Sequence, residues 1–335
     1  MQTRANDWDA RVAKTTGWCH FLQSAEWAEA LKQTAWRPNL TEVKVGQGSY
    51  RLNLHSRSVP LIGRIYQATK LARLQPAQAR AFTQGLRRQA ESGVAIKIDL
   101  DQPFDEKLHQ SLLKQGWLRT PSMQYQETVL IDLTRSREEL LKSFKKRARW
   151  ELNAGLRRGV KVEKAALTDE HMAIAYELLR STYERAHFQT RSRAFTENYW
   201  RAFAASGQGS LYFAKLDNQL LAAAFIIHIG DRAYYKDGAS VRLKPDVFAS
   251  RVMQWQIMQD LKEQGIKTYD LCGVSTNNTS DLKGVTLFKT GFGEPVRLQW
   301  GYELPLSSWR YNLWKQLIEP VVLKYSATIR RELWY

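Results

Sequence analysis

The chain has 335 residues, of which 50 are Lys or Arg and 33 are Asp or Glu, so its formal net charge at pH 7 is +17. Hydrophobic residues make up 44% of the chain, which excludes wholesale disorder, and the length predicts two domains or one large one. The longest apolar run, at 220–227, is too short to cross a bilayer, and the N-terminus has no apolar core of a signal peptide. We therefore expect a globular cytoplasmic protein with an anionic partner.

Two stretches far apart in the chain follow the same order of elements. Residues 86–100 predict the end of a helix, a cap at Gly93 and an apolar strand that ends at Asp99. Residues 261–271 repeat this order and end their strand at Asp270. The repetition favours two similar α/β domains over one large domain.

Positive charge is concentrated at 135–161, which holds ten Lys or Arg against three Glu. Ser136 and the acidic residues after it predict a helix N-terminus, and Gly155 and Gly159 predict its end before a strand at 160–162. The basic face of this helix is either a solvated surface or a contact for the phosphates of RNA or of a nucleotide-linked substrate.

The second half of the chain predicts a complete α/β unit and contains none of the common catalytic motifs. The loop at 240–246, which would hold the pyrophosphate of coenzyme A in a GNAT-type acyltransferase, has no glycine. We expect neither a cofactor nor a metal. The predicted elements are helices at 168–186 and 247–263 and strands at 210–216, 220–229, 232–237 and 267–272.

The C-terminal stretch at 309–335 alternates three Trp with five Lys or Arg. Such a segment either lies on an anionic membrane surface or packs back on the core of a domain, and nearby aliphatic residues favour packing.

Five segments of the second half, in matching order and spacing, resemble the Fem-type (FemABX) peptidoglycan aminoacyltransferases. The resemblance covers about 140–300 well and the first half only weakly. It implies an α/β (α+β) fold of two GNAT-like domains in tandem, at 1–140 and 141–302, with 303–335 packing back on the first and no coiled-coil arm. The segments lie at 143–160, 234–240, 254–255, 269–274 and 287–293.

The resemblance also implies the residues of a site. Phe288-Lys289 matches a Phe-Lys pair at the reaction centre of the family, where an ammonium group would stabilise the oxyanion formed during aminolysis of an ester. Arg191 matches an arginine that binds precursor phosphate, a role that suits a guanidinium fork. The motif at 234–240 supplies Tyr235 as a further precursor contact.

The chain departs from the family pattern at several of these positions. Phe195 stands where relatives have a tyrosine, so a hydroxyl contact is lost or moves to Tyr199, and Asp237 replaces a frequent aromatic residue. A lysine near the N-terminus is missing, which leaves Lys32 one turn later. Asp99 matches an acid considered as a general base, and it is either that base or a structural residue at the end of a strand.

The function that follows from the resemblance is transfer of an amino acid from aminoacyl-tRNA to an amine of the stem peptide of a peptidoglycan precursor. We expect a monomer, a lipid-linked rather than a nucleotide-linked precursor, and peripheral contact with the inner membrane face. The alternatives are an RNA-binding protein with a degenerate transferase fold, and transfer to a protein N-terminus or a lipid. The expected tRNA contacts are Lys145, Lys146, Arg147, Arg149, Arg157 and Arg158.

Overall fold

The computed structural model describes residues 2–186, 191–243, 245–277 and 283–326. The chain forms two compact units: unit 1 comprises Met1–Gln126 and Arg297–Tyr335, and unit 2 comprises Glu127–Val296. The division falls before the expected boundary at residue 140, because strand β7 (Glu127–Asp132) pairs with a strand of the second sheet.

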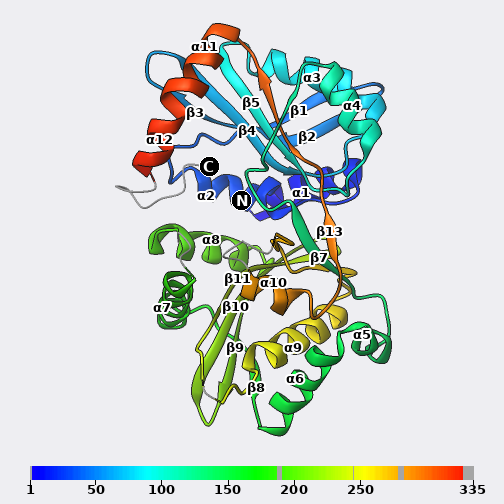
Figure 1. Ribbon diagram of the computed structural model, residues 1–335, viewed down its shortest axis with the longest axis vertical. Coiled ribbons are helices and arrows are strands. Elements are labelled where there is room, and N and C mark those ends of the chain that lie inside the picture. Colours follow the sequence, from blue (N-terminus) through cyan, green and yellow to red (C-terminus); the bar gives the residue numbers. More distant parts are fainter. Residues whose placement is uncertain (1, 187–190, 244, 278–282, 327–335) are drawn as a thin grey trace. The chain divides into compact units, whose positions relative to one another are not determined.

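Unit 1 is built around a five-stranded sheet in the order β3-β4-β5-β14-β6, in which only β4 and β5 run parallel (Figure 1). A smaller antiparallel pair, β1 and β2, packs against helix α3. All eight residues of β5 are buried, including Lys97 and Asp99, the two charged residues of an otherwise apolar strand. The strands are β1 (Leu40–Val45), β2 (Gly48–Asn53), β3 (His55–Val59), β4 (Gly63–Leu71), β5 (Gly93–Leu100), β6 (Leu118–Thr120) and β14 (Gly301–Pro305). The helices of its N-terminal part are α1 (Gln2–Thr16), η1 (Phe21–Gln23), α2 (Ala25–Leu31), η2 (Pro76–Gln78), α3 (Ala79–Gln89) and α4 (Glu106–Lys114).

The C-terminal part of the chain returns to unit 1. Strand β14 inserts between β5 and β6, and the helical segment after it buries Trp314 against Ile65 and Val94 of the sheet. This segment consists of α11 (Ser308–Leu313), a π-helical turn η3 (Trp314–Ile318) and α12 (Glu319–Tyr325). Residues 327–335, with the last Trp and two of the Arg of the basic stretch, lie outside the described residues.

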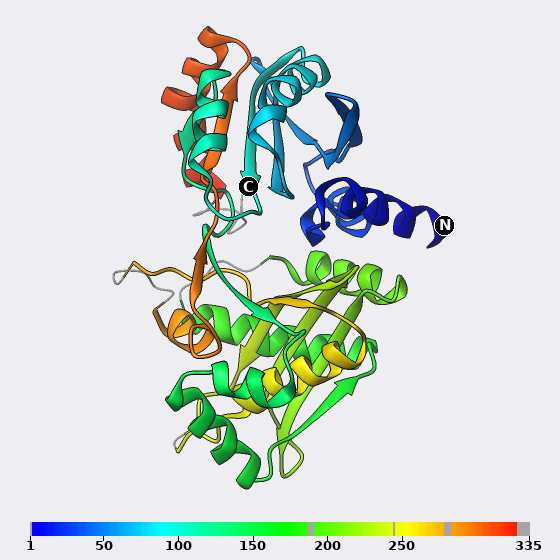
Figure 2. The same ribbon diagram turned by 90° about the vertical axis from the view of Figure 1, so that its right-hand side faces the viewer.

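Unit 2 contains a seven-stranded sheet in the order β13-β7-β12-β11-β10-β9-β8, with helices on both faces (Figures 1 and 2). Alternate residues of its long central strand β10 (Gln219–Ile229) serve the two faces: Ala224 and Ile226 join the core with α6 and α9, whereas Phe225 stacks on Trp200 of α8. The other strands are β8 (Lys161–Ala165), β9 (Gly209–Leu216), β11 (Arg232–Ser240), β12 (Thr268–Asp270) and β13 (Pro295–Arg297). The helices are α5 (Arg137–Ser143), α6 (Lys146–Arg157), α7 (Asp169–Arg185), α8 (Arg193–Ala205), α9 (Ala249–Glu263) and α10 (Lys283–Lys289).

The helices and strands expected at 168–186 and 210–272 are confirmed within three residues at each end, but the single helix expected in the basic segment is wrong. Ser136 does cap a helix, with Glu139 completing a capping box. That helix ends at Phe144, whose backbone is extended, and a second helix begins at Lys146. Gly155 lies inside this second helix rather than at its end, because α6 and α9 cross there: a Cβ atom at Gly155 would lie 2.6 Å from Cγ2 of Val252.

Among the described residues, no helix combines the length and hydropathy needed to cross a bilayer.

Candidate active site

Lys289 is the last residue of α10, and its side chain points into the protein although it ends a helix. The residue is 8% exposed, and its Nζ donates a hydrogen bond of 2.9 Å to the main-chain carbonyl of Gly273. Its ammonium group also lies 5.7 Å from the centre of the Tyr235 ring. Burial lowers the pKa of Lys289 below its usual value, and the neighbouring Cys272 and Asp270 partly oppose this. Lys289 is therefore a buried cation with hydrogen-bonding capacity left for a further acceptor.

The carbonyl that Lys289 contacts is held in place by the end of β12. The carboxylate of Asp270 accepts hydrogen bonds from the hydroxyl of Thr128, from the main-chain N–H of Cys272 at 2.7 Å and from the guanidinium of Arg232 at 3.0 Å. These bonds hold Cys272 in the left-handed region, with φ of 57°. The turn thus formed directs the Gly273 carbonyl toward Lys289.

Tyr235 lies on β11 beside Lys289, and burial raises the pKa of its hydroxyl above the usual value. Its hydroxyl occupies the space above Gly238, where an added Cβ atom would lie only 1.8 Å from the oxygen. The glycine in the motif at 234–240 is therefore needed for the position of the tyrosine ring.

Tyr199 and Asp237 form a buried polar cluster between α8 and β11. The Tyr199 hydroxyl donates to Asp237, and the Trp200 indole donates to the same carboxylate at 2.9 Å. Lys236 Nζ lies 2.9 Å from the other oxygen of Asp237. Burial and the neighbouring Asp237 raise the pKa of Tyr199 well above its usual value. Asp237 is one of the residues at which the sequence departs from the pattern expected from the resemblance. One of its carboxylate oxygens is bound by Tyr199 and Trp200, and the other is bound by Lys236.

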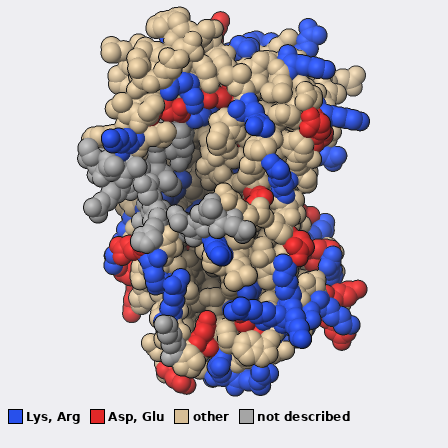
Figure 3. Space-filling view, viewed as in Figure 1, with Lys and Arg blue, Asp and Glu red and all other residues tan. Residues whose placement is uncertain are grey.

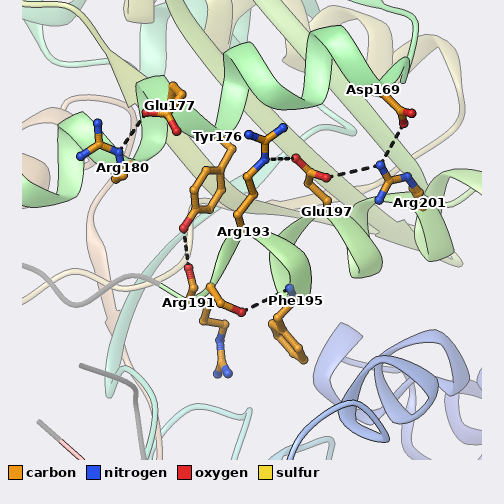
Figure 4. A network of polar contacts seen from close by, with 10 residues as sticks. Asp169, Tyr176, Glu177, Arg180, Arg191, Arg193, Phe195, Glu197 and Arg201 are labelled. Carbon is orange, nitrogen blue, oxygen red and sulfur yellow. Dashed lines mark hydrogen bonds and ion pairs between the residues drawn. The ribbon is translucent and has the colours of Figure 1, made fainter. Parts of the chain in front are cut away.

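Arg191 precedes α8, and its main chain is fixed by a hydrogen bond of 2.9 Å from the Tyr176 hydroxyl of α7. Figure 4 shows that its guanidinium points away from the ion pairs that Arg193 and Arg201 make with Glu197. The guanidinium carbon lies 5.1 Å from the centre of the Phe195 ring. Burial lowers the pKa of Arg191, while Tyr199 and Asp237 oppose this. Phe195 therefore supports the arginine with its ring face.

Two of the expected precursor contacts, Lys32 and Asp99, belong to unit 1. Lys32 caps α2 and is exposed, with its Nζ in an ion pair with Glu29. Asp99 is 1% exposed, and its two carboxylate oxygens accept hydrogen bonds from the main-chain N–H groups of Met123 at 3.1 Å and Gln124 at 2.9 Å. Burial raises the pKa of Asp99, although Lys70 and these two hydrogen bonds oppose the shift. The arrangement is that of an acid that fixes a loop.

Some of the basic residues around α6 make hydrogen bonds or ion pairs with other residues of the protein, whereas others are exposed and make no ion pair among the described residues. Arg149 donates to the carbonyls of Lys142 and Phe144 and so closes the end of α5, and Lys145 pairs with Glu294 at 3.2 Å. Arg147 pairs with Glu151 at 2.8 Å but remains 77% exposed, and Arg158 donates to the Asp246 carbonyl. In the described part of the chain, Lys146 and Arg157 are exposed and make no ion pair. Figure 3 shows Lys and Arg gathered over the α5 and α6 end of unit 2.

Trp150 is a feature of α6 that the sequence reasoning missed. It is 57% exposed, and its ring meets the Phe248 ring edge to face at 5.4 Å. An exposed tryptophan among cations is typical of surfaces that stack nucleic-acid bases. The signal available in the sequence was a tryptophan between two charged residues, Arg149 and Glu151, on a helix with a basic face.

Comparison with known proteins agrees with this description. Residues 142–283 match the family model of the acetyltransferase (GNAT) domain. The chain is 25% identical to the lipid II:glycine glycyltransferase of Staphylococcus haemolyticus, covering 73% of this chain and 76% of the relative. It is similar in structure to FemX, with a TM-score of 0.81 at 21% identity over 94% of this chain and 98% of the other. It also shares its fold with L-PGS from Bacillus licheniformis, with a TM-score of 0.57 at 13% identity over 97% of each chain.

The chain thus has the fold of the GNAT-type acyltransferases, and it is similar in sequence to the staphylococcal lipid II:glycine glycyltransferases and in structure to FemX.

Proposed function

We propose that the protein transfers an aminoacyl group from aminoacyl-tRNA to an amine on the stem peptide of a lipid-linked peptidoglycan precursor. The observation that carries the proposal is the buried ammonium of Lys289, held between a main-chain carbonyl and the Tyr235 ring. The relatives are named for glycyl transfer to lipid II, which supports the lipid-linked acceptor. Because charged tRNA is a cytoplasmic substrate, the reaction would take place at the inner face of the membrane.

The proposed chemistry needs a donor of hydrogen bonds rather than a nucleophile on the protein. The neutral acceptor amine attacks the ester carbonyl, and a C–N bond forms as negative charge develops on the carbonyl oxygen. Lys289 stabilises this oxyanion, because a cation in a site shielded from water is far more effective than one in solvent. The C–O bond to the ribose then breaks, and the proton lost by the amine is taken up by the ribose oxygen that leaves.

Arg191 and the α6 surface are proposed to bind the two substrates. The Arg191 guanidinium suits the phosphate of the precursor, because its planar fork matches two phosphate oxygens. Lys146, Arg157 and the exposed Arg147 suit the tRNA backbone, with Trp150 available for stacking on an unpaired base.

The test is a transfer assay with purified protein, a set of charged tRNAs and either lipid-linked or nucleotide-linked muropeptide. Wild type should form an aminoacylated muropeptide, and Lys289→Ala should lower the rate about 10²- to 10³-fold, as removal of an oxyanion donor does. Lys283→Ala is the matched control, since Lys283 is an exposed lysine at the other end of the same helix.

Each outcome of this assay decides a named alternative. RNA binding without transfer to any acceptor would identify a degenerate transferase. Transfer only to a lipid or to a protein N-terminus would replace the proposed acceptor. Equal rates for Lys289→Ala and Lys283→Ala would remove Lys289 from the mechanism but leave the function standing.

A further inference from the structure

Arg251 of α9 is a buried arginine that contacts Phe288, the residue before Lys289, directly. It is 6% exposed, and its guanidinium carbon lies 4.4 Å from the centre of the Phe288 ring and 4.5 Å from that of Phe292. Its Nη1 donates a hydrogen bond of 2.7 Å to the main-chain carbonyl of Phe288. The guanidinium therefore binds both the backbone and the side chain of the residue before Lys289.

Glu151 of α6 holds Arg251 in this orientation. Its carboxylate accepts from Nε of Arg251 at 2.8 Å and from Nε of Arg147 at 2.8 Å, and the residue is 8% exposed. A buried carboxylate bound by two guanidinium groups is fixed from both sides. A continuous chain of polar contacts thus runs from exposed Arg147 on α6 to the backbone of α10.

Gly291 makes room for the arginine. A Cβ atom at this position would lie 2.9 Å from both terminal nitrogens of Arg251 and 3.1 Å from Cβ of Ala148. The Gly291 carbonyl also accepts a hydrogen bond of 2.9 Å from the main-chain N–H of Lys145. The pattern Phe-Lys-Thr-Gly-Phe at 288–292 therefore has a physical explanation: two rings enclose a guanidinium, and the glycine lets it enter.

We propose that Arg251, oriented by Glu151, is a positioning residue that fixes the end of α10 so that Lys289 points at the reaction centre. The proposal rests on the role of Lys289 in the proposed function. The free energy lost when both charges leave water offsets most of the attraction between them. The Arg251–Glu151 pair is therefore expected to add little to the stability of the fold. Its contacts instead converge on the residue next to Lys289, where a displacement of about 1 Å can lower a rate about 10²-fold.

The kinetic test compares Arg251→Met and Glu151→Gln with Lys262→Met. Lys262 is the matched control, because it is a cation of the same helix α9 that also donates to main-chain carbonyls, those of Leu133 and Arg135. We expect Arg251→Met to lower kcat about 10²-fold with the KM values for both substrates unchanged, and Lys262→Met to leave kcat unchanged. Arg251→Lys should recover part of the loss, since an ammonium can reach Glu151 or the Phe288 carbonyl but not both.

A double-variant comparison separates positioning from general structural support. If Arg251 acts through Lys289, Arg251→Met should cause no further loss in a Lys289→Ala background, measured by single-turnover transfer. A loss of the same size in both backgrounds, or a kcat equal to that of Lys262→Met, would overturn the proposal. Glu151→Gln should likewise lower the rate in the wild-type background and cause no further loss in the Lys289→Ala background. It replaces Arg251→Met in this comparison if that variant does not fold.

A measurement without transfer keeps this inference separate from the proposed function. The acetylation rate of Lys289 by acetic anhydride, followed by mass spectrometry across pH, reports its burial and basicity. In Arg251→Met the end of α10 is released, so in the high-pH limit, where the amine is neutral in every variant, Lys289 should be acetylated faster than in wild type, while Lys262→Met should match wild type. Unchanged reactivity in Arg251→Met would contradict the inference even if the protein transferred no amino acid at all.

Discussion

The Nζ atom of Lys289 and the main-chain carbonyl of Gly273 lie 2.9 Å apart, and this contact joins two segments of the chain into one site. Gly273 follows β12, whose last residue Asp270 organises the turn, whereas Lys289 ends α10. A buried ammonium bound to a carbonyl is already placed to bind an oxygen that becomes more negative during a reaction.

The first prediction concerns the pH dependence that this burial creates. The pKa of Lys289 is lower in the folded protein than in the unfolded chain, where it is about 10.4, so the unfolded state binds more protons between these two values. The free energy of unfolding of wild type, relative to Lys289→Met, should therefore rise as the pH increases through that window. Denaturant titrations at pH 7 and at pH 10 check this, and a relative stability that falls with pH would contradict it.

The second prediction contrasts two helical glycines. Gly155→Ala places a Cβ atom 2.6 Å from Val252 and 3.1 Å from the Val247 carbonyl, so α6 and α9 must separate, at a cost of about 1–3 kcal/mol in the free energy of unfolding. Gly284→Ala is the same substitution with no atom within 4 Å, and it should be neutral or stabilising by about 0.5–1 kcal/mol. Equal effects in thermal unfolding would show that the helix crossing tolerates the methyl group.

The third prediction concerns the attachment of the C-terminal segment to unit 1. Lys97 of β5 contacts Glu319 at 2.8 Å and Glu303 at 3.7 Å, and all three side chains are at most 8% exposed. Lys97→Met removes a cation from two buried carboxylates, which keep Lys315 and, for Glu303, the Tyr311 hydroxyl, so we expect a loss of about 3–5 kcal/mol.

The matched control for this prediction is Lys32→Met, which breaks an exposed pair with Glu29 and should cost less than about 1 kcal/mol. Chemical denaturation measures both variants. A loss in Lys97→Met no larger than that in the control would mean that the apolar contacts of Trp314 are sufficient to hold the segment.

The fourth prediction concerns Asp99. Its pKa is raised in the folded protein, so the folded state binds the proton more tightly than the unfolded chain does above about pH 3.9. The stability of wild type, relative to Asp99→Asn, should therefore fall as the pH rises from about 4 through the raised pKa. Because both carboxylate oxygens are bound to main-chain N–H groups, we also expect Asp99→Asn to lower transfer less than tenfold, whereas loss of a general base costs about 10²- to 10⁴-fold.

The fifth prediction concerns binding of tRNA by α6. Replacing Lys146 and Arg157 by Ala should each reduce the slope of log binding constant against log salt concentration by about 0.7 to 0.9, because each phosphate contact releases a counterion. Lys267→Ala removes an exposed lysine of unit 2 that pairs with Asp231 and should leave the slope unchanged. Trp150→Ala should weaken binding by about 1–3 kcal/mol without a change in slope, since stacking is not ionic. An equal decrease in slope for Lys146→Ala, Arg157→Ala and Lys267→Ala would instead indicate a general effect of net charge.

The sequence by itself was sufficient to predict those helices and strands whose signals come from residues close together in the chain. The β10 and β11 strands, the α7 and α9 helices and the Ser136 cap follow from apolar periodicity and from hydrogen bonds between residues close in the chain. The segment at 287–293 was proposed as a candidate site from its resemblance to a segment of the Fem-type family. These features depend on a few neighbouring residues, so the sequence determines them.

Only the tertiary structure decided what depends on residues far apart in the chain. Gly155 looks like a helix end until α9 is brought against α6, and Asp237 looks like a departure from the family pattern until Tyr199, Trp200 and Lys236 surround its carboxylate. Likewise, Arg251 is one arginine among many in the sequence, and its contacts with Glu151 and Phe288 exist because three helices meet around it. Burial and pairing arise from this packing, and they decide which charges of a +17 chain are structural and which remain available to a substrate.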